Sequence, residues 1–575
     1  MREEKQIMPI LQFKGKTFVQ NHHLAVKYHQ LVPKKELSLT DKVSLHDNLI
    51  IQGDNLKALK ALLPTYSGKI KCIYIDPPYN TGNENWIYSD NVNSPMIKEW
   101  LGKVVDKEDL TKHDKWLCMM MPRLKLLREL LSEEGAIFIS CDDNEQHRLR
   151  MLMDEVFGEQ NFISNLIWQK KFSPQNDAKY FSDNHDFLIC YAKNRIDGEQ
   201  NSGFIRNLLP RTDSQDQRYS NSDNDPRGPW TSSDLTVKTY SAEYDYVITT
   251  PSGRKVNPTK GRCWFTSKAN LQKLIEDNRI WFGENENNVP RLKTFLSDVQ
   301  EGIVPLSIWL HSEVGHNQQA KQELKDIFSE IDLPFDTPKP VSLLKRIVHL
   351  STDKDDIILD SFAGSGTTAH AVIELNEDDG GNRKFILVEQ EDYANTITAE
   401  RVRRVVNNLY HQGNNRKVHK EKTAKNAKEN FYSKPFAKDL AAFAVKNNCS
   451  FSYFELGPTI EMESMLTGKS LPTYEELARY IFYTATGSEF NEKKIKRKTN
   501  YIGETDVYEL YMLYEPDIDW LKQNALTLDW VKSMPKFTGK QRLVFAPAKY
   551  VDDETCRWNR IDFCQLPYEI YRIQK

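Results

Sequence analysis

IILDSFAGSGTTA, at residues 357–369, is the stretch that decides the fold. It joins an apolar run, Ile357–Asp360, to a helical pattern that opens at Thr367, and the turn between them contains Gly364 and Gly366. Glycines let the backbone approach a ligand closely where a strand turns into a helix. The stretch therefore predicts a ligand-binding turn at the end of a parallel strand.

Strands and helices alternate on both sides of this turn. Apolar runs predict strands at 49–51, 70–75, 136–140 and 384–389. Apolar positions at helical spacing predict helices at 55–63, 122–131, 341–350 and 367–375, and a further helix that Asp142 or Asp143 caps and that runs to about Phe157. Such alternation predicts a parallel sheet with helices on both faces.

The chain divides into parts at changes in composition. Residues 196–300 are rich in Asn, Asp, Ser, Pro and Gly and interrupt the alternation, so one α/β core is built from two separated pieces of chain. The predicted parts are an N-terminal arm (1–45), the first half of the core (46–195), an insertion (196–330), the second half of the core (331–410), a basic linker (411–434) and an α+β C-terminal domain (435–575).

Composition limits the class of protein. The 575 residues carry 78 Lys and Arg against 81 Asp and Glu, a net charge of −3, with 28% charged and 39% hydrophobic residues. These values are typical of a folded globular protein and exclude a disordered chain. The eight cysteines form no CxxC pair, and no apolar stretch approaches 18 residues. We expect a cytoplasmic protein with no structural metal and no membrane contact.

A second motif follows the apolar run Ile70–Ile75. Asp76, Pro77, Pro78 and Tyr79 stand at its end, where two prolines fix a rigid extended turn. The turn presents a carboxylate, a backbone carbonyl and an aromatic ring. The two acceptors suit the N–H groups of an exocyclic amine on a planar base, and Tyr79 can stack on the ring. The motif predicts a catalytic site for such an amine.

The glycine turn by itself is ambiguous. Gly364–Ala369 also fits the GxGxxA pattern of NAD-binding folds, and Glu389, at the end of the next strand, can hold ribose hydroxyls in either case. An NAD-dependent oxidoreductase therefore remains an alternative, although it leaves Asp76–Tyr79 and the insertion without a role.

Together the two motifs resemble those of the β-class DNA amino-methyltransferases, in which a DPPY motif precedes an FxGxG motif. The chain is similar, in particular, to the modification subunits of type III restriction–modification systems. The resemblance extends through Gly53–Leu56, Asp76–Gly82, Met121–Leu124, Phe138–Asn144, His185–Lys193, Glu313–Gly315, Thr337–Pro340, Phe362–Leu375, Phe385–Val388, Val544–Lys549 and Phe563–Pro567. It implies a Rossmann-like methyltransferase core interrupted by a target-recognition insertion, and S-adenosylmethionine as cofactor.

The resemblance assigns roles by position. Asp76, Pro77, Pro78 and Tyr79 would hold the target amine, which Asp at the first position favours as adenine N6, with cytosine N4 as the alternative. Ten residues would surround the cofactor: Asp54, Lys339, Asp360, Phe362, Ala363, Gly364, Ser365, Gly366, Thr367 and Glu389. The implied activity is site-specific methylation of adenine in double-stranded DNA after base flipping.

Basic residues predict where DNA binds. The insertion holds eight candidates, namely Arg206, Arg211, Arg218, Arg227, Arg254, Lys255, Arg262 and Arg291. Residues 395–434 carry 10 Lys and Arg against 3 Glu, net +7, so Arg401, Arg403 and Arg404 are candidates for phosphate contacts. The resemblance also implies a separate restriction subunit with helicase and nuclease activity, and we expect a homodimer.

Overall fold

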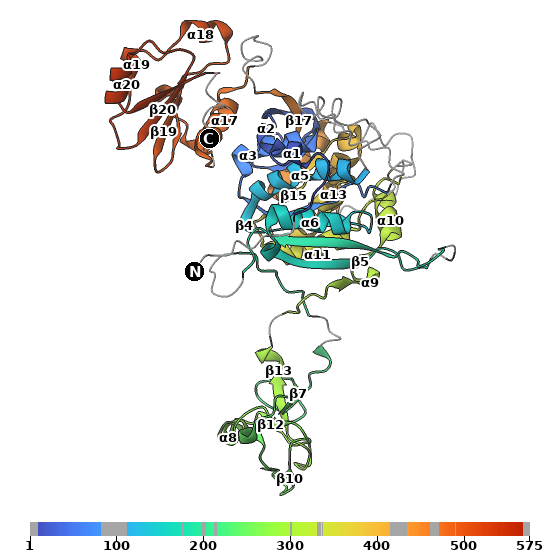
Figure 1. The fold of residues 1–575 in the computed structure, drawn as a ribbon. Helices are drawn as coiled ribbons and strands as arrows, with labels where there is room; N and C mark the ends of the chain where they lie inside the picture. Colours follow the sequence, from blue (N-terminus) through green and yellow to red (C-terminus); the bar gives the residue numbers. More distant parts are fainter. Residues whose placement is uncertain are drawn as a thin grey trace. The chain divides into compact units, whose positions relative to one another are not determined.

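The computed structural model describes residues 10–81, 112–174, 176, 178–196, 203–211, 216–299, 302–329, 335, 337–413, 434–460, 471–488 and 490–566. The chain separates into two compact units (Figure 1). We call residues 1–207 with 307–575 the large unit, and residues 208–306 the insertion unit. Within the described residues, no helix is long and apolar enough to cross a membrane.

The large unit is built on one sheet that has ten strands in its described part. From edge to edge these are β1 (His29–Pro33), β17 (Phe451–Thr459), β2 (Asn48–Gln52), β16 (Lys384–Glu389), β15 (Ile357–Asp360), β3 (Ile70–Ile75), β4 (Leu131–Cys141), β6 (His185–Ala192), β5 (Phe162–Gln169) and β14 (Ile308–Trp309). Neighbours from β17 to β4 run parallel, whereas β6 is antiparallel to both β4 and β5.

Helices cover both faces of this sheet. One layer contains α3 (Asn55–Tyr66), α5 (Lys112–Leu130) and α6 (Gln146–Phe157), and the other contains α11 (Val341–Ser351), α12 (Thr367–Asp379) and α13 (Glu400–Gly413). Strand β3 shows why both layers are needed. Ile73 and Ile75 lie in the core with α3, α5 and α6, while Cys72 lies beside Ser351 of α11. A strand buried on both faces has an unbroken apolar sequence.

The sequence predicted strand β3 with the observed bounds, but two helix starts differ. Helix α5 includes Lys112 and carries Pro122 inside, although we expected Pro122 to open it. Helix α6 begins at Gln146 instead of after Asp142, because the Asp142 side chain accepts the Asn144 N–H at 2.9 Å in a preceding turn.

The two ends of the chain also differ from expectation. Residues 29–33, placed in an N-terminal arm, form the sheet edge β1, and residues 451–459, placed in a C-terminal domain, form β17 beside it. Beyond them, helix α17 (Tyr474–Thr486) and a second sheet form a distinct core. The strands of that sheet are β18 (Tyr501–Glu504), β19 (Tyr508–Met512), β20 (Gln541–Ala546) and β21 (Ile561–Gln565). Most of the predicted linker 411–434 lies outside the described residues.

The insertion unit is narrower than the predicted range 196–330, since residues 307–329 contribute β14, α9 (His311–Val314) and α10 (Asn317–Ile327) to the large unit. Its own sheet pairs β7 (Trp230–Asp234), β13 (Arg291–Phe295) and β12 (Ile280–Trp281), green in Figure 1. Helix α8 (Lys268–Glu276) and the short strands β8 (Thr236–Val237), β9 (Ile248–Thr249), β10 (Lys255–Val256) and β11 (Cys263–Trp264) complete it.

Candidate active site

Parallel pairing brings the two sequence motifs together. Strands β15 and β3 are neighbours, with Leu359 opposite Ile73, so Asp360 and Asp76 end adjacent strands at the same edge. Strand β16 lies on the other side of β15 and ends at Glu389. Parallel α/β sheets bind ligands outside the carboxyl ends of their strands. Segments almost 300 residues apart in the chain therefore form one candidate site.

Asp76 lies at the centre of a polar cluster. The Tyr79 hydroxyl donates to Asp76 Oδ1 at 2.9 Å. The ammonium group of Lys339 donates to Asp76 Oδ2 and lies 5.3 Å from the centroid of the Tyr79 ring. Both oxygens of the Asp76 carboxylate thus already accept a hydrogen bond. Lys339, a predicted cofactor residue, therefore contacts the predicted catalytic turn.

The turn after β3 is held from the side of helix α5. The Trp116 indole N–H donates to the Pro78 carbonyl at 2.7 Å, and Lys112 Nζ donates to the Asn80 carbonyl at 3.0 Å. Asn80 adopts φ 58°, which Asn tolerates better than most residues, and its side-chain amide donates to buried Glu145. These contacts fix the position of Tyr79 before a ligand arrives.

The glycine turn is held by the two neighbouring strand ends. Asp360 accepts the Phe362 N–H at 3.0 Å and the Thr368 hydroxyl at 2.5 Å. Ala363 N–H donates to the Val388 carbonyl at 3.1 Å. A Cβ atom at Gly366, where φ is 78°, would lie 2.9 Å from the Thr398 carbonyl oxygen. Only glycine fits there, since both the backbone conformation and the close contact exclude a side chain.

The turn offers a polar group that has no partner of its own. The Ser361 hydroxyl is buried and makes no hydrogen bond in the structure. A buried polar atom of this kind is costly unless a ligand or water satisfies it. Phe335 lies against Gly364 and meets the Tyr393 ring edge to face at 5.7 Å. Aromatic surface, glycine backbone and a free hydroxyl fit a cofactor that contains an aromatic base and polar groups.

Glu389 is a second acidic group in contact with this turn. Its Oε2 accepts the Gly364 N–H at 2.7 Å and its Oε1 accepts the Glu391 N–H at 3.0 Å. Burial is the largest influence on Glu389 and raises its pKa to about 7. Burial likewise raises the pKa of Asp360 to about 7. Glu389 therefore changes charge close to neutral pH.

This pKa predicts how cofactor affinity depends on pH. Ribose hydroxyls that donate to Glu389 favour its ionised form, so we expect the affinity for S-adenosylmethionine to weaken as the pH falls from 8 to 6. The stability of the fold depends on pH in the opposite sense. Between about pH 4.5 and 7, Glu389 is protonated in the folded state but ionised in the unfolded chain. The Glu389 contribution to the free energy of unfolding therefore decreases as pH rises through this window.

Titration calorimetry at pH 6, 7 and 8 would measure how the affinity for S-adenosylmethionine changes with pH. Glu389→Gln should bind more weakly at pH 8 and show a flatter pH dependence. Glu377→Gln, at an exposed position of helix α12, is the matched control and should keep the wild-type profile. An identical slope in wild type and Glu389→Gln would contradict the assignment.

Arg401 was predicted to contact phosphate, and the structure corrects this prediction. Its side chain is 0% exposed. The guanidinium donates to Ser365 Oγ at 3.0 Å and to Thr367 Oγ1 at 2.7 Å, on the cofactor turn. Burial lowers its pKa to about 10, so it stays charged at neutral pH. Helical spacing from the apolar residues Ile397 and Val405 indicated an inward-facing position, and we had overlooked it.

Two more polar groups escaped the sequence reasoning. Buried Arg123 donates from Nε to Asn55 Oδ1 at 2.6 Å, and the Asn55 amide donates to the Ser361 carbonyl at 3.1 Å. Helix α5 thus supports the cofactor turn through α3. Asp54, a predicted cofactor residue, caps α3 by accepting the Lys57 N–H at 3.0 Å.

The other arginines of helix α13 also have structural partners. Arg403 donates to the Leu37 carbonyl at 2.7 Å and to Glu400, and Arg404 donates to Glu400 at 2.9 Å. These ion pairs join the helix to neighbouring segments. Both guanidinium groups thus have protein partners, and their predicted phosphate contacts stay a prediction.

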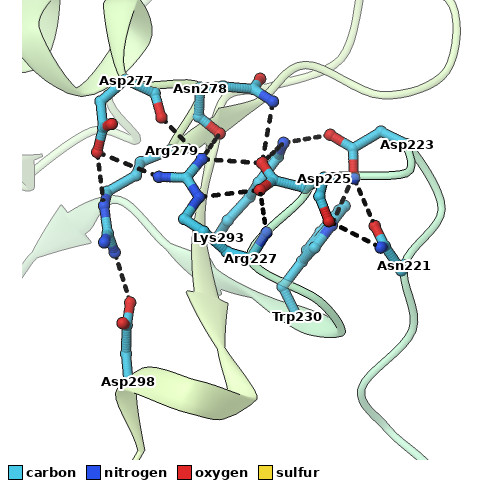
Figure 2. A network of polar contacts seen from close by, with 10 residues as sticks. All are labelled: Asn221, Asp223, Asp225, Arg227, Trp230, Asp277, Asn278, Arg279, Lys293 and Asp298. Carbon is cyan, nitrogen blue, oxygen red and sulfur yellow. Dashed lines mark hydrogen bonds and ion pairs between the residues drawn. The ribbon is translucent and has the colours of Figure 1, made fainter.

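The insertion unit is centred on a buried charged network (Figure 2). Lys293 is buried and contacts Asp223 and, at 3.6 Å, Asp225. Arg227 donates to both oxygens of Asp225, at 2.9 and 2.8 Å. Trp230 donates its indole N–H to Asp223 at 2.7 Å. The loop before β7, strand β7 and strand β13 are joined in this way, and Asn278 donates to Asp225 from the loop after helix α8.

This network changes the expectation for the insertion arginines. Arg227 lies inside it, Arg211 pairs with Asp216 at 2.7 Å, and Arg262 pairs with Asp234 at 2.9 Å. The remaining candidates have exposed side chains, namely Arg206, Arg218, Arg254, Lys255 and Arg291. Among these, Arg254 donates to the Asn287 carbonyl and Arg291 to Ser232. The exposed basic residues remain candidates for DNA contacts, whereas the Arg227 guanidinium is engaged in hydrogen bonds to Asp225.

Replacement of Arg227 by Ala should lower the free energy of unfolding by about 2 kcal/mol, because charge-assisted hydrogen bonds to a buried carboxylate are lost. The salt dependence of DNA binding should not change. Urea denaturation followed by tryptophan fluorescence measures the first effect, and binding at several salt concentrations measures the second. Exposed Lys255→Ala is the control and should leave stability within about 0.5 kcal/mol. A salt slope reduced by about 0.9 in Arg227→Ala would instead indicate a phosphate contact.

The fold defines the class: this is a Rossmann-like methyltransferase core in which the Asp76–Tyr79 turn and the glycine turn follow adjacent strands. The family model described as DNA methylase, for N6 and N4 enzymes, matches residues 70–400, more than half of the chain. The chain therefore belongs to the DNA methylase family. Family membership sets aside the NAD-dependent oxidoreductase alternative.

Relatives agree with this family. The type III StyLTI Mod subunit of Salmonella typhimurium is 36% identical over 402 residues, 67% of this chain and 59% of that one. The type III EcoP15I Mod subunit of Escherichia coli is 32% identical over 60% of this chain and 58% of that one. The type II methyltransferase M.KpnI of Klebsiella pneumoniae is 31% identical over 62% of this chain and 82% of that one. The match thus spans less than two thirds of the two type III subunits.

Proposed function

We propose that this chain is a site-specific DNA methyltransferase that transfers a methyl group from S-adenosylmethionine to adenine N6 in double-stranded DNA. The observation that carries the proposal is the placement of the Asp76–Tyr79 turn beside the glycine turn, on adjacent strands β3 and β15. Such an arrangement brings an exocyclic amine and a cofactor to the same edge of the sheet.

The residues of the turn activate the amine. Its lone pair is delocalised into the base, so the nitrogen is a poor nucleophile. Asp76 and the Pro77 carbonyl each accept one N–H, which favours a pyramidal nitrogen with an available lone pair and stabilises the transition state selectively. When bound, S-adenosylmethionine supplies the electrophilic methyl group. As the carbon–nitrogen bond forms, the displaced proton passes to Asp76.

Lys339 has a role before the base arrives. Because the Lys339 ammonium group donates to Asp76 Oδ2, the N–H of the incoming base must displace that ammonium group. Tyr79 keeps its hydrogen bond to Asp76 Oδ1 and presents its ring to the base. The site thus keeps its carboxylate neutralised and oriented until the substrate supplies a donor. Glu389, Ser361 and the turn 362–367 hold the cofactor beside it.

The identity of the methylated base tests the proposal. The full chain is incubated with radiolabelled S-adenosylmethionine and genomic double-stranded DNA, and the digested nucleosides are separated by mass spectrometry. We expect N6-methyladenine, and single-molecule sequencing of the same DNA then gives the recognised site. N4-methylcytosine would contradict the choice of base, and no label in DNA would contradict the proposed activity.

The type III relatives extend the proposal to partners. We propose that the chain acts in the cytoplasm as a homodimeric modification subunit beside a restriction subunit with helicase and nuclease activity. The names of the StyLTI and EcoP15I relatives support this, since both are Mod subunits. Light scattering of the purified chain, alone and with the restriction subunit, would test it. A monomer that binds no such subunit would contradict it.

A further inference from the structure

Strands β5 and β6 are joined by a loop, of which residues 170–174, 176 and 178–184 are described (Figure 1). Strand β6 is antiparallel to β4, with Ser140 opposite Leu188, and β4 is parallel to β3, with Ile75 opposite Ile139. The start of β6 therefore lies at the same edge as the end of β3. The loop leaves the sheet at this edge, with strand β4 between β6 and β3.

The base of this loop is fixed. Lys170 pairs with the buried carboxylate of Asp186 at 2.6 Å and with Asp183 at 3.3 Å. Lys171 N–H donates to the Asn184 carbonyl at 3.2 Å, which continues the pairing of β5 and β6 by one step. A loop held in this way positions the residues beyond its base relative to the site.

Three aromatic side chains on the loop are exposed, among them Phe172 at 55%. Tyr180 is 81% exposed and Phe181 is 96% exposed. Phe172, on the other arm of the loop, differs because its ring stacks on His311 with centroids 5.5 Å apart. Neighbouring exposed aromatic side chains beside a candidate active site indicate a binding surface.

The charges around these rings suit a nucleic acid. Lys179 precedes them, with its ammonium group 5.4 Å from the Tyr180 ring centroid, and Lys171 lies on the opposite arm. An aromatic pair next to lysines can stack on bases while the ammonium groups approach phosphates. Apolar side chains are known to enter duplex DNA between bases in this way.

We propose that Phe181, with Tyr180 beside it, enters the DNA duplex and fills the space that the target adenine leaves when it turns into the site. The proposal rests on the proposed function, because it needs a base that leaves the duplex. Removing a base from the stack costs free energy, and a ring that replaces the lost stacking lowers that cost. The occupant of this surface is thus the base stack of double-stranded DNA.

The test uses the full chain and a DNA duplex that carries 2-aminopurine at the target adenine, whose fluorescence rises when the base leaves the stack. Phe181→Ala should lower both this rise and the methylation rate at least tenfold. Phe172→Ala, the same substitution on the other arm of the loop, is the matched control and should stay within twofold of wild type. Affinity for S-adenosylmethionine should be unchanged in both variants.

A mismatched partner base opposite the target separates this role from a structural one. The mismatch makes the target easier to extrude, so it should restore most of the activity of Phe181→Ala, whereas a misfolded loop would not be rescued. Wild-type fluorescence and activity in Phe181→Ala, no rescue by the mismatch, or a change of oligomeric state in this variant would overturn the proposal. Wild-type chain that methylates no DNA would overturn the proposed function as well.

Discussion

Replacing Asp76 by Ala is expected to reduce methyl transfer by roughly 10³-fold or more while leaving DNA affinity largely intact. The reason is that Asp76 acts on the amine only as the nitrogen becomes pyramidal, and removal of one such group commonly costs a factor of 10² to 10³. A radiolabel transfer assay under single-turnover conditions would measure the rate, and a filter-binding assay would measure DNA affinity.

Loss of Asp76 also removes the anion that Lys339 contacts, so the fold has to be checked. Asp76→Asn keeps the shape of the side chain and should be nearly as inactive, because an amide cannot take the displaced proton. Asp143→Asn is the matched control, since Asp143 is an exposed residue just after the neighbouring strand β4. It should transfer methyl groups normally. Substantial activity in Asp76→Asn, with normal unfolding, would refute the catalytic role of Asp76.

Replacing Arg401 by Met is expected to weaken the binding of S-adenosylmethionine at least tenfold, about 1.4 kcal/mol. Methionine keeps an apolar stem of similar length but cannot donate to Ser365 and Thr367. The glycine turn therefore loses two hydrogen bonds that hold it in position. Titration calorimetry measures the affinity. The salt dependence of DNA binding should stay that of wild type, because a buried guanidinium contacts no phosphate.

Arg404→Met provides the matched comparison for Arg401. It removes the same type of side chain from the same helix, and Arg404 donates to Glu400 and to the Ile327 carbonyl. We expect this variant to lose stability but to bind the cofactor with normal affinity. Equal cofactor affinities in Arg401→Met and wild type would contradict the role of Arg401. If DNA binding by Arg401→Met depended less steeply on salt than that of wild type, Arg401 would contact a phosphate, as the sequence suggested.

Much of the core was predictable because its signals are local. Strand β3 has the bounds that its apolar run predicted, and the turns after Ile75 and Asp360 lie where prolines and glycines indicated. Strand and helix periodicity depend on neighbouring residues only. Parallel strands then place Asp76, Asp360 and Glu389 at one edge. The candidate catalytic and cofactor turns were therefore readable from the sequence.

The roles of the charged residues were not predictable in the same way. Arg227 and Arg401 are basic residues in segments that suggested DNA contacts, yet one lies in a salt-bridge network and the other is buried under the cofactor turn. The net charge of a segment follows from how many basic and acidic residues it contains. It does not show in which direction each side chain points. Direction depends on the helix face and on carboxylates that other segments supply.

By itself, then, the sequence determined the chain order of most core strands and helices and the positions of the two candidate turns, because these follow from periodicity and from residues adjacent in the chain. The pairing of β3 with β15, which brings the two turns to one sheet edge, belongs to the tertiary structure. Only the tertiary structure decided that Lys339 holds Asp76, that Arg401 supports Ser365 and Thr367, and that the insertion unit spans 208–306. Lys339 and Asp76 are 263 positions apart. Contacts over such separations arise from the packing of whole elements, which no local pattern records.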